Sequence, residues 1–287
     1  MGEKILEIVL GPTAVSKTDA ALKRALQCGS PVISCDSRQI YLEMRIGTAC
    51  PSDEQLCAVK HYFIRDHSIF DGLYTAGKYE LEAISLIEKL FAEGHDRLVM
   101  CGGSCFYIEA LCSGLDDFPE AAPLLRETLT RRLAEEGVES LRCDLRRLDP
   151  ASYESIDIAN GQRVVRALEV CISTGRPFSS FKTAPRKKRS FTIRKIGLRR
   201  PREELYARIN ARVLQMMDDG LEKEARSLLA YRNFPALQTV GYKELFDCFD
   251  GAYSLEKAVE LIQRNTRHYA KRQLSWWGRD SSIEWTE

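Results

Sequence analysis

The segment with the clearest chemical potential is a loop near the N-terminus that reads Gly11-Pro12-Thr13-Ala14-Val15-Ser16-Lys17-Thr18. It follows the apolar run 5–10 and precedes a helical pattern over 19–27. A strand, a tight loop and a helix N-terminus in this order direct backbone N–H groups and a lysine at one point, where an oligophosphate can bind. We therefore predict a phosphate-binding loop in which Lys17 supplies a mobile positive charge and the Thr18 hydroxyl binds Mg²⁺.

One position departs from the usual loop template, G-x-x-x-x-G-K-[ST]. Ser16 stands where the template has glycine before the lysine, and its Cβ restricts backbone conformations that glycine adopts freely. We expect this serine to weaken phosphate affinity more than it disturbs the fold. The alternative interpretation is a strand–loop–helix junction that matches the template by chance.

A second candidate for chemistry follows the apolar run 31–35, which ends in Asp36-Ser37-Arg38-Gln39. Ligands of α/β proteins bind at the carboxyl ends of parallel strands, so Asp36, beside a phosphate loop, is our leading candidate for a catalytic residue. An aspartate after a strand is also a common turn or N-cap residue. Both interpretations remain open at the level of the sequence.

A third strand end carries a glycine pair, in the segment Gly102-Gly103-Ser104 after the apolar run 98–101. Two glycines allow the chain to turn tightly into the helix that follows. Nucleotide-hydrolysing enzymes usually hold Mg²⁺ with an acidic residue at such a strand end, and this one has none. That difference argues against nucleotide hydrolysis.

Strand and helix patterns alternate around these segments, which indicates a parallel sheet with right-handed crossovers. We predict an α/β fold: a P-loop-type parallel-sheet core flanked by helices, residues 1–113 and 181–287, with an all-helical insertion domain, residues 114–180. Further core strands are predicted at 61–66 and 192–198. Helices are predicted at 76–93, 106–112, 123–136, 137–149, 150–156, 162–174, 203–217, 221–230, 242–249 and 255–277.

Composition excludes several classes of protein. The 287 residues are 44% hydrophobic and 29% charged, which is typical of globular domains. No apolar run approaches the ~20 residues that span a bilayer and no signal peptide is recognisable, so we expect a soluble, cytoplasmic protein without membrane partners, and a monomer. The ten cysteines form no C-x-x-C pair, which favours reduced, mostly buried thiols over disulfides or zinc.

The net charge is only +1, but basic residues are unevenly distributed. From Phe181 to Arg202, ten of 22 residues are Lys or Arg and none is acidic. In the last predicted helix Arg264, Arg267, His268 and Lys271 fall at i, i+3, i+4 and i+7, on one face. Such runs are often only solvated faces, yet two of them in a nearly neutral protein suggest a polyanion longer than a nucleotide.

An ordered set of motifs along nearly the whole chain resembles the bacterial tRNA dimethylallyltransferases, also called tRNA isopentenyltransferases. Besides the loop, these motifs are Asp36-Ser37-Arg38-Gln39-Ile40-Tyr41, Ile46-Gly47-Thr48-Ala49, Gly102-Gly103-Ser104 with Tyr107, R-x-x-R-A-L-E-V at 163–170, Q-T-V-G-Y-K at 238–243, and Thr266-Arg267 with Ala270-Lys271-Arg272-Gln273. The resemblance implies transfer of a dimethylallyl group from dimethylallyl diphosphate to N6 of adenosine 37, beside the tRNA anticodon, with Mg²⁺.

The resemblance also implies roles for individual residues. Asp36 matches the general base, Thr13 and Lys17 match catalytic loop positions, and Arg212 matches an arginine that reaches the diphosphate, although Arg208 lies close to it in the same helix. The loop Gly11–Thr18 would bind the diphosphate. The anticodon stem-loop would contact Asp36, Ser37, Arg38, Gln39, Ser104, Arg126, Gln162, Arg163, Val164, Val165, Arg166, Gln238, Thr239, Val240, Gly241, Tyr242 and Lys243, with backbone phosphates held by residues 186–189 and 264–271.

Two departures from the family pattern keep other functions open. Ser16 replaces the loop glycine, and Cys105 replaces a glycine after Ser104; both are expected near the reaction channel. One alternative is a tRNA-binding paralogue with weakened catalysis. Another is a P-loop small-molecule kinase, in which the insertion covers ATP, but that function explains neither Asp36 and its neighbours nor the basic C-terminal stripe.

Overall fold

The structure, a computed structural model, describes residues 3–116, 118–119, 123–182 and 187–286. The chain divides into two compact units, one of residues 1–112 and 189–287 and the other of residues 113–188. The second boundary lies eight residues later than the 180/181 boundary expected from the sequence. The 3₁₀ helix η2, Phe178–Phe181, packs against the helices of the second unit, which keeps this segment with them.

The first unit is built on a six-stranded sheet in the order β3-β2-β4-β1-β5-β6. Every pairing is parallel, which confirms the predicted α/β fold. The central strand β1 is buried along its whole length, as expected of a parallel sheet covered on both faces. The strands are β1 Ile5–Leu10, β2 Val32–Ser34, β3 His61–Tyr62, β4 Arg97–Gly102, β5 Thr192–Leu198 and β6 Ile283–Thr286.

The register of the sheet brings three predicted segments to one edge. Leu10 pairs with Gly102, and Ser34 pairs with Cys101, so the loops that follow β1, β2 and β4 leave the sheet side by side. Gly102 is required here because a Cβ at this position would lie 2.5 Å from the carbonyl oxygen of Cys35. Close backbone contact at this edge therefore packs the segments that follow β2 and β4 against each other.

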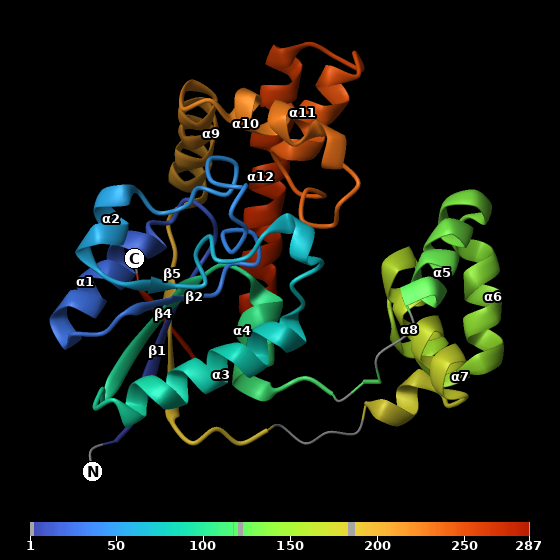
Figure 1. The fold of residues 1–287 in the computed structure, drawn as a ribbon, viewed down its shortest axis with the longest axis horizontal. Helices are drawn as coiled ribbons and strands as arrows, with labels where there is room; N and C mark the ends of the chain where they lie inside the picture. Colours follow the sequence, from blue (N-terminus) through green and yellow to red (C-terminus); the bar gives the residue numbers. More distant parts are fainter. Residues whose placement is uncertain (1–2, 117, 120–122, 183–186, 287) are drawn as a thin grey trace. The chain divides into compact units, whose positions relative to one another are not determined.

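Helices of the first unit flank the sheet, and α9 to α12 gather together in Figure 1. In α9 and α12 the buried residues recur at helical spacing and pack the two helices against each other. The helices are α1 Lys17–Cys28, α2 Asp53–Ala58, α3 Ala76–Ala92, α4 Cys105–Ser113, α9 Arg202–Asp218, α10 Leu221–Ser227, α11 Tyr242–Phe249 and α12 Leu255–Trp277. Two short 3₁₀ helices are η1 Ile69–Asp71 and η3 Leu229–Tyr231.

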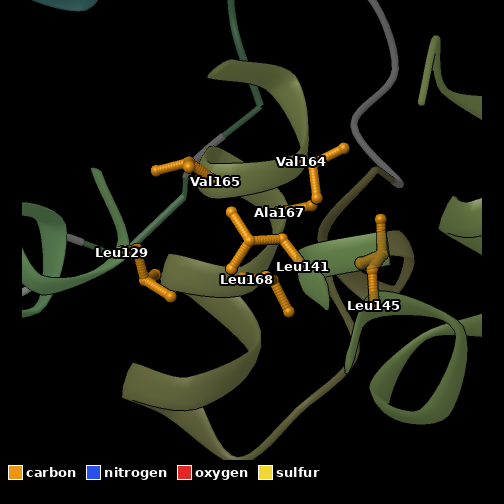
Figure 2. Close-up of a cluster of buried hydrophobic side chains, with 7 residues drawn as sticks. All are labelled: Leu129, Leu141, Leu145, Val164, Val165, Ala167 and Leu168. Carbon is orange, nitrogen blue, oxygen red and sulfur yellow. The ribbon is translucent and has the colours of Figure 1, made fainter. Parts of the chain in front are cut away.

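The second unit is helical in its described part and has its own core, shown in Figure 2. Helix α8 supplies Val164, Val165, Ala167 and Leu168 to this core, where they meet leucines of α5 and α6. Asp149 ends α6 and caps α7, because its side chain accepts a hydrogen bond from the Ser152 backbone. The helices are α5 Pro123–Glu136, α6 Val138–Leu148, α7 Pro150–Ser155 and α8 Gly161–Thr174.

The local structure differs from the sequence analysis at three places, one a wrong prediction and two elements that were not predicted. The strand predicted over 61–66 ends at Tyr62, because Phe63 and Arg65 have positive φ angles that a strand does not accommodate. Helix α2 falls in a segment to which no element was assigned, although Ser52 and Gln55 form a capping box at its start. Strand β6 was not anticipated after the last helix.

The expectation of mostly buried thiols also needs correction. All ten cysteines are free, but only Cys35 and Cys171 are buried, and Cys57 and Cys143 are exposed. The cysteines therefore do not form one buried class. In the part of the chain that the structure describes, no helix has the length and apolar character needed to cross a membrane.

Candidate active site

The predicted phosphate loop joins β1 to α1 and has an unusual backbone. Ala14 and Ser16 both adopt left-handed conformations, with φ of 65° and 74°. Gly11 has φ 150°, and a Cβ there would lie 2.6 Å from the Leu198 carbonyl oxygen. The loop is therefore tightly turned, and at Ser16 it has a conformation that glycine would adopt at lower cost.

Lys17 is the first residue of α1 and folds back over the loop. Its Nζ donates a hydrogen bond to the Pro12 carbonyl oxygen at 2.8 Å. Burial lowers the pKa of the Lys17 ammonium, the negative charge of Asp36 opposes that shift, and the positive charge of Arg212 adds to it. A partly desolvated ammonium close to a second cation is well placed to bind an anionic group.

Asp36 follows β2 as predicted. Its Oδ1 accepts hydrogen bonds from the backbone N–H groups of Arg38 at 2.9 Å and Gln39 at 3.3 Å. Asp36 is thus a turn aspartate, as one interpretation had it. Its Oδ2 has no hydrogen-bond partner among the described residues, so the same side chain also offers a carboxylate oxygen to a ligand.

Ser37 and Ser104 connect the loops that follow β2 and β4. The Ser37 backbone N–H donates to the Ser104 hydroxyl at 2.8 Å, and the Ser104 hydroxyl lies 3.1 Å from that of Ser37. Ser104 is buried, so its hydroxyl fixes the turn that carries Asp36. Cys105 begins α4 with an ordinary negative φ and does not line the cavity described below, which means that glycine is not required at this position.

A cavity of about 540 Å³ lies where these loops meet α9 and α12. It contains both the phosphate loop and the Asp36 segment, which the sequence had placed at neighbouring strand ends. The predicted site residues that line it are Thr13, Ala14, Val15, Ser16, Lys17, Thr18, Asp36, Ser37, Arg38, Gln39, Arg212, Thr239, Val240 and Gly241. Other predicted residues of this unit lie outside the lining: Gly11, Pro12, Ser104, Gln238, Tyr242 and Lys243.

The two arginines of α9 have different surroundings. Arg208 donates from Nε to the Ala14 carbonyl oxygen at 2.8 Å and from Nη2 to the Ser16 hydroxyl at 2.6 Å. Arg212 lines the cavity and has no hydrogen bond or ion pair among the described residues. Burial and the nearby Arg208 charge lower the pKa of Arg212. A desolvated cation beside a second cation is in an environment that favours binding of an anion.

Gln273 is a site residue whose contacts the sequence did not reveal. It is buried in α12, its Oε1 accepts from the Thr13 backbone N–H at 3.0 Å, and its Nε2 donates to the Gly103 carbonyl oxygen at 2.7 Å. One amide side chain thereby joins the loops after β1 and β4. Gln273 belongs to one of the family motifs, but only the fold shows what it contacts.

Glu224 of α10 is a second residue that sequence reasoning missed. Its carboxylate accepts hydrogen bonds from three consecutive backbone N–H groups, those of residues 45–47, at 2.8 to 3.1 Å. It also accepts from the buried Tyr242 hydroxyl at 2.7 Å. Since Gly47 lines the cavity, Glu224 positions one cavity wall, and the Tyr242 side chain is part of that support.

In the helical unit, Glu169 holds two of the arginines predicted to bind tRNA. It is fully buried, Arg126 donates to both of its oxygens, and Arg166 Nη1 lies 3.2 Å from Oε2. Burial favours the neutral acid, but the bonds and charges of the two arginines outweigh it and lower the pKa of Glu169. Arg126 and Arg166 therefore have a structural partner within their own unit.

The remaining predicted RNA contacts differ in exposure. Val164 and Val165 are buried in the core of the helical unit (Figure 2), so the prediction for this segment concerns the exposed Gln162 and Arg163 and the half-buried Arg166. Gln238 and Lys243 are exposed, as are Arg264, His268 and Lys271 of the C-terminal stripe.

The predicted basic segment 186–189 lies only partly within the described residues. Arg186 lies outside the described residues. Arg189 does not suit a phosphate contact in this structure, because its guanidinium bonds Glu80 at 2.9 Å and the Ala110 and Leu111 carbonyl oxygens.

Comparison with known proteins gives a consistent result. A family model described as IPP transferase matches residues 39–280. The chain is 50% identical over 280 residues to tRNA dimethylallyltransferase 2 of Porphyromonas gingivalis, covering 98% of this chain and 93% of the relative. It is 45% identical over 280 residues to tRNA dimethylallyltransferase 1 of Bacteroides thetaiotaomicron, covering 98% and 90%.

Solved structures agree with these relatives. The full-length tRNA isopentenylpyrophosphate transferase of Bacillus halodurans shares 34% identity and a TM-score of 0.71, over 99% of this chain and 89% of that chain. A eukaryotic dimethylallyltransferase acting on tRNA has a TM-score of 0.82 at 23% identity, over 99% and 73%, and so shares the fold. The matched residues and these identities establish that the chain belongs to the tRNA dimethylallyltransferase, or IPP transferase, family.

Proposed function

We propose that this chain transfers a dimethylallyl group from dimethylallyl diphosphate to N6 of adenosine 37 in tRNA. The observation that supports this most strongly is the content of one cavity. It combines a phosphate loop and Arg212, which suit a diphosphate, with the Asp36 carboxylate, which suits an amine. Among the described residues Arg212 has no partner and one Asp36 oxygen accepts no hydrogen bond.

Asp36 acts as the general base in this proposal. The lone pair of the exocyclic amine is delocalised into the adenine ring, so the amine becomes a better nucleophile as it loses a proton. Asp36 Oδ2 accepts that proton while the nitrogen forms a bond to C1 of the dimethylallyl group and the C1–O bond to diphosphate breaks. A positioned base of this kind contributes about 10²–10⁴-fold in rate.

The diphosphate leaving group gains negative charge as its bond breaks. Lys17, Arg212 and the loop N–H groups stabilise that charge. The residues fit a bound Mg²⁺, because the Thr18 hydroxyl lines the cavity without a hydrogen bond among the described residues, and Mg²⁺ in such sites takes few protein ligands besides phosphate oxygens and water. When bound, Mg²⁺ would neutralise part of the diphosphate charge.

Exposed or half-buried polar and basic side chains on both units bind the RNA. Gln162, Arg163 and Arg166 serve on the helical unit, and Gln238 and Lys243 serve on the α/β unit. The target adenosine must leave its stack before its amine can reach Asp36, as in other enzymes that modify a base. The cytoplasmic location and the monomeric state stay predictions.

The test is incorporation of labelled dimethylallyl groups into an unmodified anticodon stem-loop with A36-A37-A38. A matched stem-loop carries inosine at position 37, which lacks the N6 amine. Incorporation only into the first RNA, with N6-dimethylallyladenosine identified after digestion, supports the proposal. No incorporation into a stem-loop that still binds would contradict it and favour the weakened paralogue.

A further inference from the structure

The departure from the loop template at Ser16 has a structural partner. Ser16 lies in the left-handed region with φ 74° and ψ 36°, and Ala14 lies there as well with φ 65°. Residues with a Cβ adopt this region at a cost and are held in it only by their surroundings. A loop with two such residues needs contacts that glycine would make unnecessary.

Arg208 supplies contacts to both residues at once. Its Nε donates to the Ala14 carbonyl oxygen at 2.8 Å and its Nη2 donates to the Ser16 hydroxyl at 2.6 Å. The planar guanidinium suits two acceptors in a fixed arrangement, which the single ammonium of a lysine cannot reproduce. Between them, Val15 is buried against Leu205 and Ile209 of the same helix, so polar and apolar contacts hold the loop on α9.

Arg208 is occupied by the loop, whereas Arg212, one helical turn further along α9, lines the cavity without a partner among the described residues. We propose that Arg208 is a positioning residue that holds the phosphate loop in its ligand-binding conformation through the Ser16 hydroxyl, while Arg212 contacts the diphosphate. This division deepens the proposed function and rests on it only for the identity of the anion.

Inorganic diphosphate with Mg²⁺ is the probe, and its Kd is measured by calorimetry for single and double variants. Ser16→Ala keeps the Cβ but loses the hydroxyl, so diphosphate binding weakens roughly 10-fold. Ser16→Gly removes the strain at position 16 together with the hydroxyl, so binding stays within about 3-fold. Arg208→Lys weakens binding roughly 10-fold in the native chain and about 3-fold or less in the Ser16→Gly variant.

Arg212→Lys is the matched control, because a residue that contacts diphosphate directly loses the same factor in both backgrounds. Thermal melting of each variant shows whether it is folded. Arg208→Lys is used because lysine keeps the positive charge and the long side chain of arginine. Equal losses for Arg208→Lys in the native chain and in the Ser16→Gly variant would overturn the proposal, because Arg208 would then not act through the Ser16 hydroxyl. A failure of prenyl transfer with the coupling intact would overturn the proposed function instead.

Discussion

The two units of this protein use arginine in opposite ways. On α9 of the α/β unit, Arg208 braces the phosphate loop and leaves Arg212 beside the cavity, with no partner among the described residues. On the helical unit, Arg126 and Arg166 both bind the buried Glu169. The α/β unit therefore has a guanidinium at its cavity without a partner in the described part of the chain, whereas the helical unit uses two of its arginines to satisfy a buried charge.

This difference distinguishes residues that can contact a ligand from residues that stabilise the fold. In a sequence motif both kinds of residue are written simply as arginine, and only the contacts of each side chain in the structure distinguish them. We infer that the chemistry depends on the cavity side chains that have no partner within the described ranges, and that RNA affinity on the helical unit depends most on Arg163, whose ion-pair partner Asp157 lies 3.9 Å away.

The largest effect is expected for Asp36→Asn. An amide cannot accept the proton of the N6 amine, so the maximal single-turnover rate should fall about 10²–10⁴-fold while stem-loop affinity stays nearly constant. Asp218→Asn, which changes a carboxylate at the end of α9, is the control and should have no effect. A normal rate for Asp36→Asn would remove Asp36 from the role of base.

The second largest effect is expected for Lys17→Met, with a loss of about 10²–10³-fold in kcat/KM for dimethylallyl diphosphate, because the substitution removes a positive charge that stabilises the leaving diphosphate. Since the pKa of Lys17 is lowered, the native rate should also decline with rising pH before the usual lysine range is reached. Lys23→Met, on the same helix α1, should leave both the kcat/KM and its pH profile unchanged.

Glu224→Gln tests whether the carboxylate of Glu224 is needed to hold the cavity wall at residues 45–47 in place; Glu224 has no role in the chemical step itself. An amide oxygen cannot accept hydrogen bonds from all the N–H and O–H donors that the carboxylate satisfies, so kcat/KM should fall roughly 5- to 150-fold through loss of about 1–3 kcal/mol. Glu222→Gln alters a nearby carboxylate of the same helix, which pairs with Arg226, and should be silent. Equal effects of the two substitutions would contradict a special role for Glu224.

Glu169→Gln addresses stability in the helical unit. Loss of the charge-assisted bonds to Arg126 and Arg166 should lower the free energy of unfolding by about 1–3 kcal/mol at pH 7. Because folding lowers the pKa of Glu169 through its bonds to the two arginines, the stability gained from its ionised form is fully present above the unfolded pKa and disappears as pH falls through the folded pKa. Denaturant unfolding at several pH values would show it; a pH-independent difference would argue against an ionised Glu169.

Arg163→Ala should have the smallest effect. Removing one phosphate contact should weaken stem-loop binding several-fold and reduce the slope of log affinity against log salt by about 0.7–0.9. Arg147→Ala removes a similarly exposed arginine of α6 and is the control. An unchanged salt slope for Arg163→Ala would place the RNA elsewhere on this unit.

The sequence was informative where local patterns decide structure. It predicted the parallel sheet, most helices and the meeting of the loop with Asp36, because strand ends and helix periodicity are local properties. It could not reveal the contacts of Gln273 with Thr13 or of Glu224 with the backbone of residues 45–47, since these partners lie far apart in the chain. The sequence also did not reveal which residues of a motif are exposed. Arg163 and Val164 are neighbours in one motif, yet Arg163 is exposed and Val164 is buried in the core.

The most direct test asks whether catalysis and RNA binding depend on different residues, and it measures the maximal rate and the RNA dependence in one experiment. Single-turnover transfer to the stem-loop is followed over a range of RNA concentrations for the native chain, Asp36→Asn and Arg163→Ala. If Asp36 serves the chemistry and Arg163 serves RNA binding, Asp36→Asn should lower only the maximal rate, and Arg163→Ala should raise only the RNA concentration at which half of the maximal rate is reached. A fall in maximal rate for Arg163→Ala as large as that for Asp36→Asn would contradict this assignment of roles.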